Sequence, residues 1–230
     1  MPVLASLTLL AVLSANKSKG PAPKDIELLN DATEVVQTLT ETPDSSIPED
    51  LLKKSECILV FPKMKKGAFI VGGTGGKGVA SCRGKDDRMG APAVFGIGGA
   101  SIGFQVGGQS SDVVLLVMNP AGMDRLLRDR CKIGADATAA AGPVGRTTQA
   151  STDIAMHAQI LTWSRARGLF AGVSLDGTTI QPADEANARL YGKGATAREI
   201  IIKQEHATPE IAKAFVETIR KHTARATKKP

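Results

Sequence analysis

Glycine alternates with larger apolar residues through much of the middle of this chain, and this pattern limits the folds available to it. Residues 94–106 read VFGIGGASIGFQV, and residues 73–78 read GTGGKG. Glycine weakens helices and marks bends or close backbone approach in strands, so the pattern predicts strongly curved strands. The chain has 24 Gly but only one Trp, one Tyr and six Phe, which fits tight approach between backbones.

Short apolar runs bounded by turn signals predict the strands. The expected strands cover residues 57–61, 68–71, 94–106, 112–118, 154–163 and 169–175. The run DVVLLVM at 112–118 is typical of a strand buried on both faces. Pro62 is expected to end the first strand, GGTGGKG is expected to form a hairpin turn, and Asp176-Gly177 marks another turn.

Helical signals lie mostly toward the two ends of the chain. The expected helices cover residues 25–41, 48–55, 119–129, 183–190 and 210–226. Asp25 and Asn119 are placed to cap their helices, and Pro48 and Pro120 occupy first-turn positions. The expected fold class is therefore α+β: a Gly-rich, strongly curved, mainly antiparallel sheet or barrel, with peripheral helices at both ends.

Three regions are expected along the chain. Residues 1–23 contain an uncharged apolar run at 3–15 and a polar linker, residues 24–205 form the folded domain, and residues 206–230 form a basic amphipathic helix and tail. The run resembles the core of a signal peptide, although no basic residue precedes it. We therefore expect export to the periplasm or the cell exterior. The alternative is a buried helix or a misassigned start, with a cytoplasmic protein.

The net charge of +6 favours anionic partners. The segment 208–230 holds six cations against two acids and so carries +4 of that charge. The helix within it either lies on a membrane, offers its apolar face to a protein partner, or docks on the sheet, and docking is favoured. No feature calls for nucleic acid.

Two motif matches do not support catalysis. Gly73, Gly75 and Gly78 match a dinucleotide-binding pattern, but strand-like residues follow where a helix is required. Gly99-x-Ser101-x-Gly103 matches a nucleophile elbow, again without the helix. The three His and three Cys lack metal-ligand spacing. We expect no enzyme, no cofactor and no metal.

Five lysines gather within fourteen residues: Lys53, Lys54, Lys63, Lys65 and Lys66. Only Glu56 opposes them in that stretch. Near an anionic bilayer each such lysine contributes about 1 kcal/mol. The lysines are therefore either a headgroup-binding patch or an ordinary solvated face.

From Ile47 to about Ile202 the chain resembles the SYLF domain. The matching strings, in family order, are IPEDLLKKSECILVFP, KKGAFIVGG, GKGV, GGASIGFQVGGQSSDVVLLVMN, KIGADATAAAGPVGR, LTWSRARGLFAGVSLDG and ANARLYG. The resemblance implies a non-catalytic domain that binds lipid or membrane surfaces. Eukaryotic members join it to SH3 or FYVE modules, bind phosphoinositides and, in fungi, bind and bundle actin. Bacterial members resemble this chain, with a signal-like segment before one such domain.

The resemblance also suggests a second set of site residues. Arg146, Arg165 and Arg167 lie in the matched strings and could build a headgroup pocket. Their alternative is a structural ion pair with Asp136, Asp153 or Asp176.

The chain departs from the family pattern in the helix before the domain. That helix is often basic in eukaryotic relatives, whereas residues 24–41 hold five acids against Lys24. Membrane insertion of that helix is therefore not expected.

Within the matched region, Cys57 and Cys82 fall at two strand ends. In an exported chain they could form one disulfide worth about 3 kcal/mol, with Cys131 left free. In a cytosolic chain all three would be thiols.

A second function class stays open: a cell-envelope protein that binds a protein partner without lipid specificity, through an apolar sheet face or the C-terminal helix.

Overall fold

A single sheet organises the computed structural model, which describes residues 20–41, 46–67, 73–100, 110–145, 157–166 and 168–225. Within those residues its strands are β1 (Cys57–Gly67), β2 (Gly73–Cys82), β3 (Ala93–Ala100), β4 (Ser111–Val117), β5 (Cys131–Lys132), β6 (Ala139–Ala141), β7 (Ile160–Ala166), β8 (Leu169–Gly172) and β9 (Thr179–Pro182). Their order across the sheet is β5-β9-β3-β2-β1-β4-β7-β6, and β8 also pairs with β7. Every pairing is antiparallel except β6 with β7.

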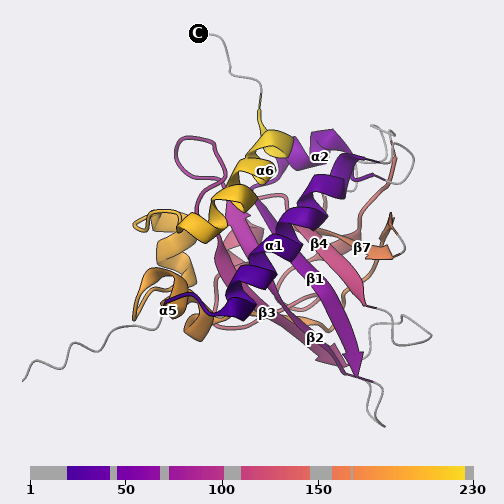
Figure 1. The fold of residues 1–230 in the computed structure, drawn as a ribbon. Helices are drawn as coiled ribbons and strands as arrows, with labels where there is room; N and C mark the ends of the chain where they lie inside the picture. The colour runs from indigo at the N-terminus through magenta and orange to yellow at the C-terminus, as the bar shows by residue number, and fades with distance from the viewer. Residues whose placement is uncertain are drawn as a thin grey trace, which may run out of the picture.

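Helices flank this sheet. They are α1 (Pro23–Gln37), α2 (Glu49–Lys54), α3 (Pro120–Leu126), α5 (Asp184–Tyr191) and α6 (Lys213–Thr223), with short helical turns η1 (Thr38–Thr40), η2 (Glu199–Lys203) and η3 (Glu210–Ala212). Helices α1, α2 and α6 lie together over one face of the strongly curled sheet (Figure 1). The expected α+β class, with a curved and mainly antiparallel sheet, is confirmed. The strand path runs open from β5 to β6, which makes it a half-barrel.

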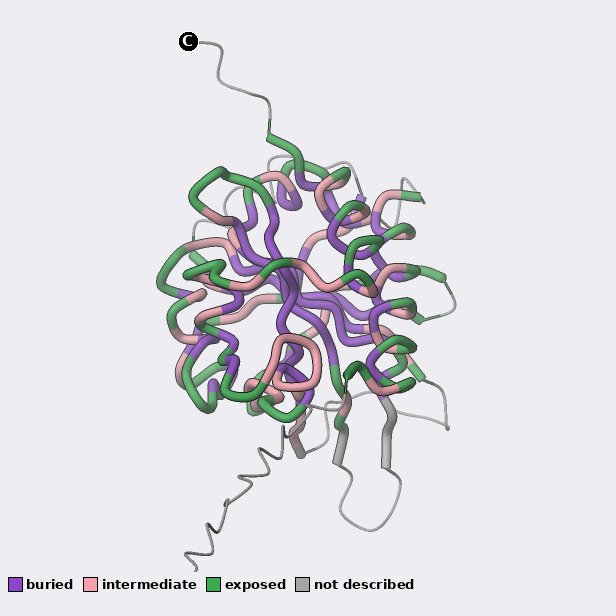
Figure 2. The backbone as a smooth tube through the Cα atoms, turned by 60° about the vertical axis from the view of Figure 1, so that its left-hand side comes forward, coloured by how far each residue is buried: buried purple, intermediate pink, exposed green. Residues whose placement is uncertain are grey.

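Buried side chains lie on both faces of the sheet. The buried strands cross the centre of the molecule, and the exposed residues lie around them (Figure 2). In β4, Val113, Leu115 and Val117 face one core cluster, whereas Val114 and Leu116 face the other. The second cluster also holds apolar residues of α1, α5 and α6. The prediction that β4 is buried on both faces is confirmed.

The first hairpin differs from the sequence-based prediction. β1 continues through Pro62 to Gly67. Its pairing with β2 and its pairing with β4 both shift register across that proline, which forms a bulge that accommodates it. Lys63 there has a φ of 48°. The residues 73–78 form part of β2 and not the predicted turn. The strand predicted at 68–71 lies outside the described residues.

Two helix caps were predicted. The Asn119 side chain caps α3 by accepting a hydrogen bond from the Gly122 amide at 2.9 Å, which confirms that cap. Asp25 is not the N-cap residue, because α1 begins two residues earlier at Pro23, but it helps to cap the helix from the third helical position. Its carboxylate reaches back to the Ala22 amide at 3.0 Å.

The C-terminal helix docks on the domain. Phe215, Val216 and Ile219 of α6 are buried in the core cluster that contains α1, which confirms the expected docking. This apolar face is covered and therefore does not offer itself to a protein partner. The predicted domain boundaries at residues 23 and 205 stay predictions. No helix within the described residues is both long and apolar enough to cross a bilayer.

Candidate functional site

The five predicted lysines fall at two separate places. Lys53 and Lys54 end α2, whereas Lys63, Lys65 and Lys66 lie in the second half of β1. From the start of β1 to Lys63 the chain advances by roughly 20 Å at about 3.3 Å per residue. The ends of β1 and β2 extend past α1, away from α2 (Figure 1). The structure therefore does not bring these lysines into one patch.

The charges around the end of α2 are largely balanced. The Lys53 ammonium pairs with Glu49 at 2.8 Å, and this hydrogen bond raises the pKa of Lys53. Arg225, just after α6, pairs with Asp87 at 2.7 Å and with Glu56 at 3.2 Å. Because these cations already have carboxylate partners, this end of the molecule is poorly suited to bind an anion.

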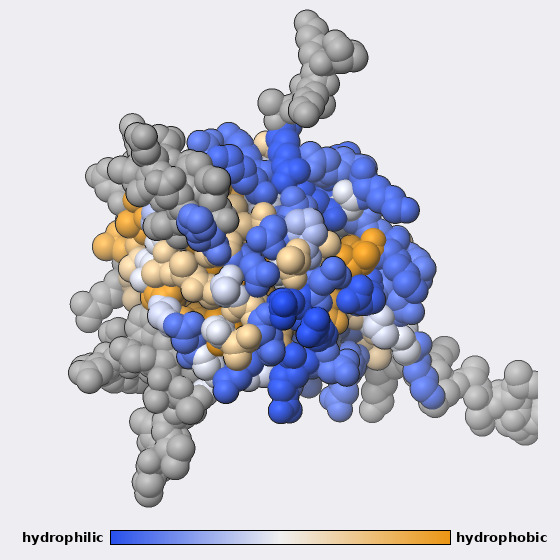
Figure 3. Space-filling view, turned by 180° about the vertical axis from the view of Figure 1, so that it is seen from behind, coloured by the Kyte–Doolittle hydropathy of each residue, from blue (hydrophilic) through white to orange (hydrophobic). Residues whose placement is uncertain are grey.

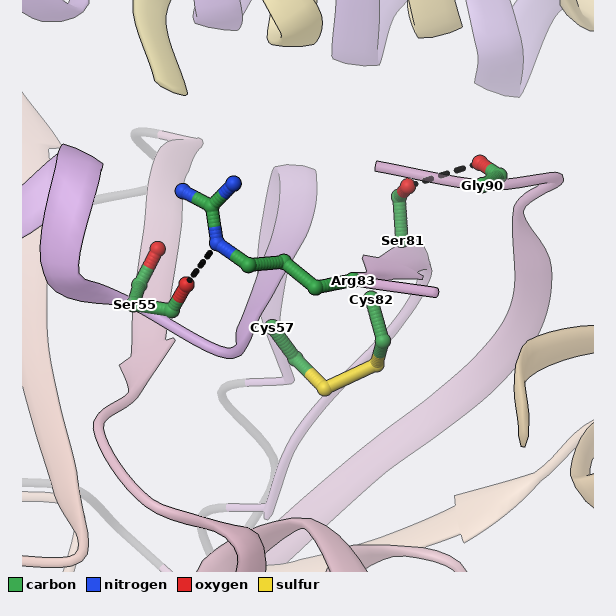
Figure 4. The surroundings of a disulfide bond; sticks show 6 residues. All are labelled: Ser55, Cys57, Ser81, Cys82, Arg83 and Gly90. Carbon is green, nitrogen blue, oxygen red and sulfur yellow. Dashed lines mark hydrogen bonds between the residues drawn. A yellow bond between two sulfur atoms is a disulfide. The ribbon is translucent and has the colours of Figure 1, made fainter. Parts of the chain in front are cut away.

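Arg83 is buried beside the same end and is committed to backbone oxygens. Its Nε donates to the Ser55 carbonyl at 2.8 Å (Figure 4), and its Nη1 donates to Asp87 O at 2.7 Å. Its Nη2 donates to Lys53 O and Thr223 O, both at 2.8 Å. Burial lowers the pKa of this guanidinium. Arg83 thus has a structural role and joins the end of α6 to the end of α2.

A disulfide lies next to Arg83. Cys57 and Cys82 occupy opposite positions of the β1–β2 pair, and their sulfurs are 2.01 Å apart (Figure 4). Both residues are buried. Cys131 is a free thiol in the core, and burial raises its pKa. The bond ties the first hairpin together where the sheet meets α2.

A polar cleft of about 280 Å³ lies where α1 passes the far part of β1, and it holds two of the predicted cations. The Lys63 ammonium contacts Asp31 of α1 at 2.8 Å, which raises the pKa of Lys63. Arg165 contacts Asp112 of β4 at 2.7 Å and donates to the Thr38 hydroxyl at 2.7 Å.

Three acidic groups line this cleft: Asp31, Glu34 and Asp112. They outnumber the two cations, so the cleft is a salt-bridged junction and not an open anion pocket. Arg165 has a structural partner as one of the sequence hypotheses proposed, but the partner is Asp112 and not Asp136 or Asp176. Arg146, Arg167 and Asp153 lie outside the described residues.

The far end of the first hairpin carries a different group of lysines. Lys65 is paired in register with Gly75 and Lys66 with Thr74. Lys77 of β2 is paired with Gly96 of β3 and is exposed. Among the described residues no ion pair involves Lys77. We call Lys65, Lys66 and Lys77 the basic arm. Sequence reasoning missed Lys77, because it lies 11 residues beyond Lys66 and joins the same hairpin only through the pairing of β1 with β2.

Seen from behind (Figure 3), the surface combines hydrophilic areas with a broad apolar area at one side and a smaller apolar patch at the other. Among the described residues, the large apolar side chains that are well exposed are Ile26, at 41%, and Leu169, at 56%. Large apolar side chains are therefore rare on the described surface, which favours charge as a basis for recognition.

The catalytic motifs receive no support from their surroundings. Gly73, Gly75 and Gly78 lie inside β2, whose next element is β3 and not a helix. His206 stacks edge-on against Tyr191, with ring centroids 5.5 Å apart, and His222 lies 3.4 Å from the Thr40 hydroxyl. The described part of the chain contains no group of acidic, His and Cys side chains arranged to hold a metal. Ser101 and Gly103 lie outside that part.

Comparison with known proteins gives the family. The Ysc84 family, described as "Las17-binding protein actin regulator", matches residues 98–222. The SH3 domain-containing YSC84-like protein 1 of Homo sapiens is 30% identical over 197 residues, covering 85% of this chain and 56% of that protein. The protein of the same name from Xenopus laevis is 32% identical over 186 residues, covering 79% and 54%.

A fungal relative matches over a similar part of the chain. LAS seventeen-binding protein 3 of Saccharomyces cerevisiae is 30% identical over 175 residues, covering 75% of this chain and 38% of that protein. The chain thus spans about half the length of the animal relatives, or less for the yeast protein. The resemblance seen in the sequence is confirmed, and the chain belongs to the Ysc84 (SYLF) family.

Proposed function

We propose that this chain is a non-catalytic domain that binds peripherally to anionic lipid surfaces, including phosphoinositide-like headgroups. The observation that carries the proposal is the basic arm. Lys65 and Lys66 lie in the last part of β1, and Lys77 lies in β2. Lys77 is exposed and has no ion-pair partner among the described residues. Each cation that reaches an anionic surface contributes about 1 kcal/mol, so three of them give useful but reversible attachment.

Three of the other predicted cations contribute less to this function, because each already has a carboxylate partner. Lys53 and Arg165 are each held by a carboxylate within 2.8 Å, so a lipid phosphate would have to displace an existing partner. Lys63 is also paired, although its side chain is more than half exposed. An exposed pair of this kind is worth little, so Lys63 can exchange Asp31 for a headgroup at small cost.

A second candidate is recognition of a protein partner. The family description, "Las17-binding protein actin regulator", and the name of the yeast relative, LAS seventeen-binding protein 3, favour a protein ligand for those proteins. For this chain, such a partner would bind elsewhere than at the apolar face of α6, which is buried. Such binding would be detected in the absence of any lipid, in contrast to binding to vesicles.

We also propose that the chain is exported. The apolar run at residues 3–15 supports export, as does a disulfide between two buried strand residues, because such bonds persist in oxidising compartments. Measuring the mass of the mature protein after expression in a secretion-competent host tests this. Loss of an N-terminal segment supports export, and an intact chain that stays inside the cell contradicts it.

Vesicle co-sedimentation of the full chain tests lipid binding. Neutral phosphatidylcholine vesicles are compared with vesicles that contain an anionic phospholipid, at low and at high salt. We expect binding to the anionic vesicles that weakens as salt rises. Lys65→Glu with Lys66→Glu should weaken it far more than Lys53→Glu with Lys54→Glu, which carries the same charge change. Equal binding to neutral vesicles at every salt concentration would overturn the proposal.

A further inference from the structure

A groove of about 330 Å³ lies on the sheet surface, near the basic arm but separate from the Lys63–Arg165 cleft. Its lining residues are Gly96, Ile97, Gly98, Arg130, Thr179 and Gln181. We call it the glycine groove. Its volume is at the small end of the range for ligand pockets, which suits a headgroup-sized molecule.

Strand pairing places cations on both sides of this groove. Residues that are paired in register form a row across five strands. In order from β1 to β5, this row is Lys65, Gly75, Gly98, Thr179 and Lys132. Residues directly opposite one another in a sheet share a face. This row therefore has a lysine at each end and two glycines between them.

The neighbouring row repeats the arrangement. Lys77 is opposite Gly96, and Gly96 is opposite Gln181. Arg130, directly before β5, lines the groove beyond Gln181. On this face of the sheet, Gly75, Gly96 and Gly98 thus form a floor without side chains. Lys77 lies at one side of it, and Arg130 and Lys132 lie at the other.

Packing inside the domain does not require glycine at two positions of this floor, Gly75 and Gly96. A Cβ on Gly96 would approach no atom closer than 3.9 Å, and one on Gly75 would meet Ile97 O at 3.5 Å, an ordinary contact. On the opposite face, a Cβ on Gly78 would lie 2.4 Å from Val60 O, so there glycine is needed. A strand glycine without an internal reason fits a place where another molecule approaches the backbone.

The cations at the groove are free to meet a ligand. Lys77, Arg130 and Lys132 are exposed, and among the described residues no ion pair involves any of them. The carboxylate of Asp136 accepts a hydrogen bond from the Lys132 backbone amide at 2.7 Å. Asp129 adjoins Arg130 in sequence. The positive charges exceed these acids, so the groove favours an anion.

We propose that the glycine groove binds a phosphate ester. Arg130 suits bidentate contact with phosphate oxygens, and Lys77 and Lys132 supply further charge. Gln181 and Thr179 offer polar contacts to the alcohol part of the ester. The backbone of Gly96 and Gly98 is engaged in pairing with β2 and β9, so it supplies a flat contact surface rather than free amides. This inference rests on the proposed lipid function, for which it identifies the headgroup site.

The test uses the full chain and two phosphate sources. One is a phosphatidylcholine vesicle that contains a phosphoinositide, and the other is a soluble inositol trisphosphate followed by amide chemical shifts. Lys77→Glu with Arg130→Glu removes the cations, and Gly96→Val fills the floor without a charge change. Lys193→Glu with Lys85→Glu is the matched control, because both residues are exposed and lie outside the groove lining.

We expect the Lys77/Arg130 variant to bind vesicles at least ten-fold more weakly, a loss of about 1.4 kcal/mol or more, because each cation near the surface contributes about 1 kcal/mol and two are reversed. Gly96→Val should also weaken binding, whereas the control should change it by less than about three-fold. Shifts confined to Gly96, Gly98 and Arg130 with the soluble ester would support the site even without vesicle binding. Vesicle binding that responds equally to variant and control would overturn the groove but leave the lipid function intact.

Discussion

The guanidinium of Arg189 forms two hydrogen bonds of 2.7 Å with the carboxylate of Asp25, 164 residues earlier in the chain. Asp25 lies in the first turn of α1 and is almost fully buried, while Arg189 lies on α5. The neighbouring Asn187 binds both backbone groups of Val94 in β3, at 2.7 and 3.1 Å. Through these contacts α5 connects the start of the N-terminal helix to the sheet.

Replacing one member of this pair should destabilise the domain. In Arg189→Ala the Asp25 carboxylate stays buried without its partner, so we expect a loss of about 3 kcal/mol in the free energy of unfolding. Urea denaturation measures it. Lys213→Ala is a suitable control, because its pair with Glu210 is exposed and should contribute less than about 1 kcal/mol. Equal effects of the two substitutions would show that the buried pair contributes no more to the free energy of unfolding than an exposed pair.

The same pair should make stability depend on pH in acid. The hydrogen bond from Arg189 lowers the pKa of Asp25 below its usual value. A lowered folded-state pKa means that the carboxylate stabilises the fold fully above its unfolded pKa, near about 3.9. This contribution is lost as the pH falls through the lowered value. The stability gap between the native chain and Asp25→Asn should therefore narrow below about pH 4, and a constant gap would contradict this.

The disulfide predicts a specific pattern of thiol reactivity. In denaturant without reductant, an alkylating reagent should modify Cys131 alone, because Cys57 and Cys82 are bonded. After reduction all three should react, as mass spectrometry will show. Reduction should lower the free energy of unfolding by about 3 kcal/mol, given a separation of 25 residues. Three reactive thiols before reduction would exclude the bond in the isolated protein.

Local patterns predicted those elements whose signals are contained within the element. The apolar run of β4 and the Asn119 cap were identified because neither depends on distant residues. The continuation of β1 through Pro62 was missed, since the bulge depends on pairing with both β2 and β4. The glycines at 73–78 were assigned to a turn for the same reason.

The candidate site depended even more on long-range contacts. Lysines close in sequence suggested one patch, yet Lys63 is paired with Asp31, 32 residues away, and Arg165 with Asp112, 53 residues away. Lys132 was not considered, because it joins the row of Lys65 only through four intervening strand pairings. The net charge indicated an anionic partner, but only the three-dimensional structure shows which cations have no carboxylate group as an ion-pair partner.

Two glycines of neighbouring strands should respond oppositely to the same substitution. In Gly78→Ala the new methyl group would lie 2.4 Å from both Val60 O and Phe61 Cδ1. Because backbone cannot move aside easily, we expect a loss of about 1 to 3 kcal/mol in the free energy of unfolding. In Gly96→Ala the methyl group has room, and the alanine restricts the unfolded chain, so stability should stay equal or rise by up to about 1 kcal/mol. Thermal unfolding of the two variants in parallel measures the difference. A stable Gly78→Ala together with a destabilised Gly96→Ala would mean that the glycine floor serves the fold, and the argument for a ligand there would fail.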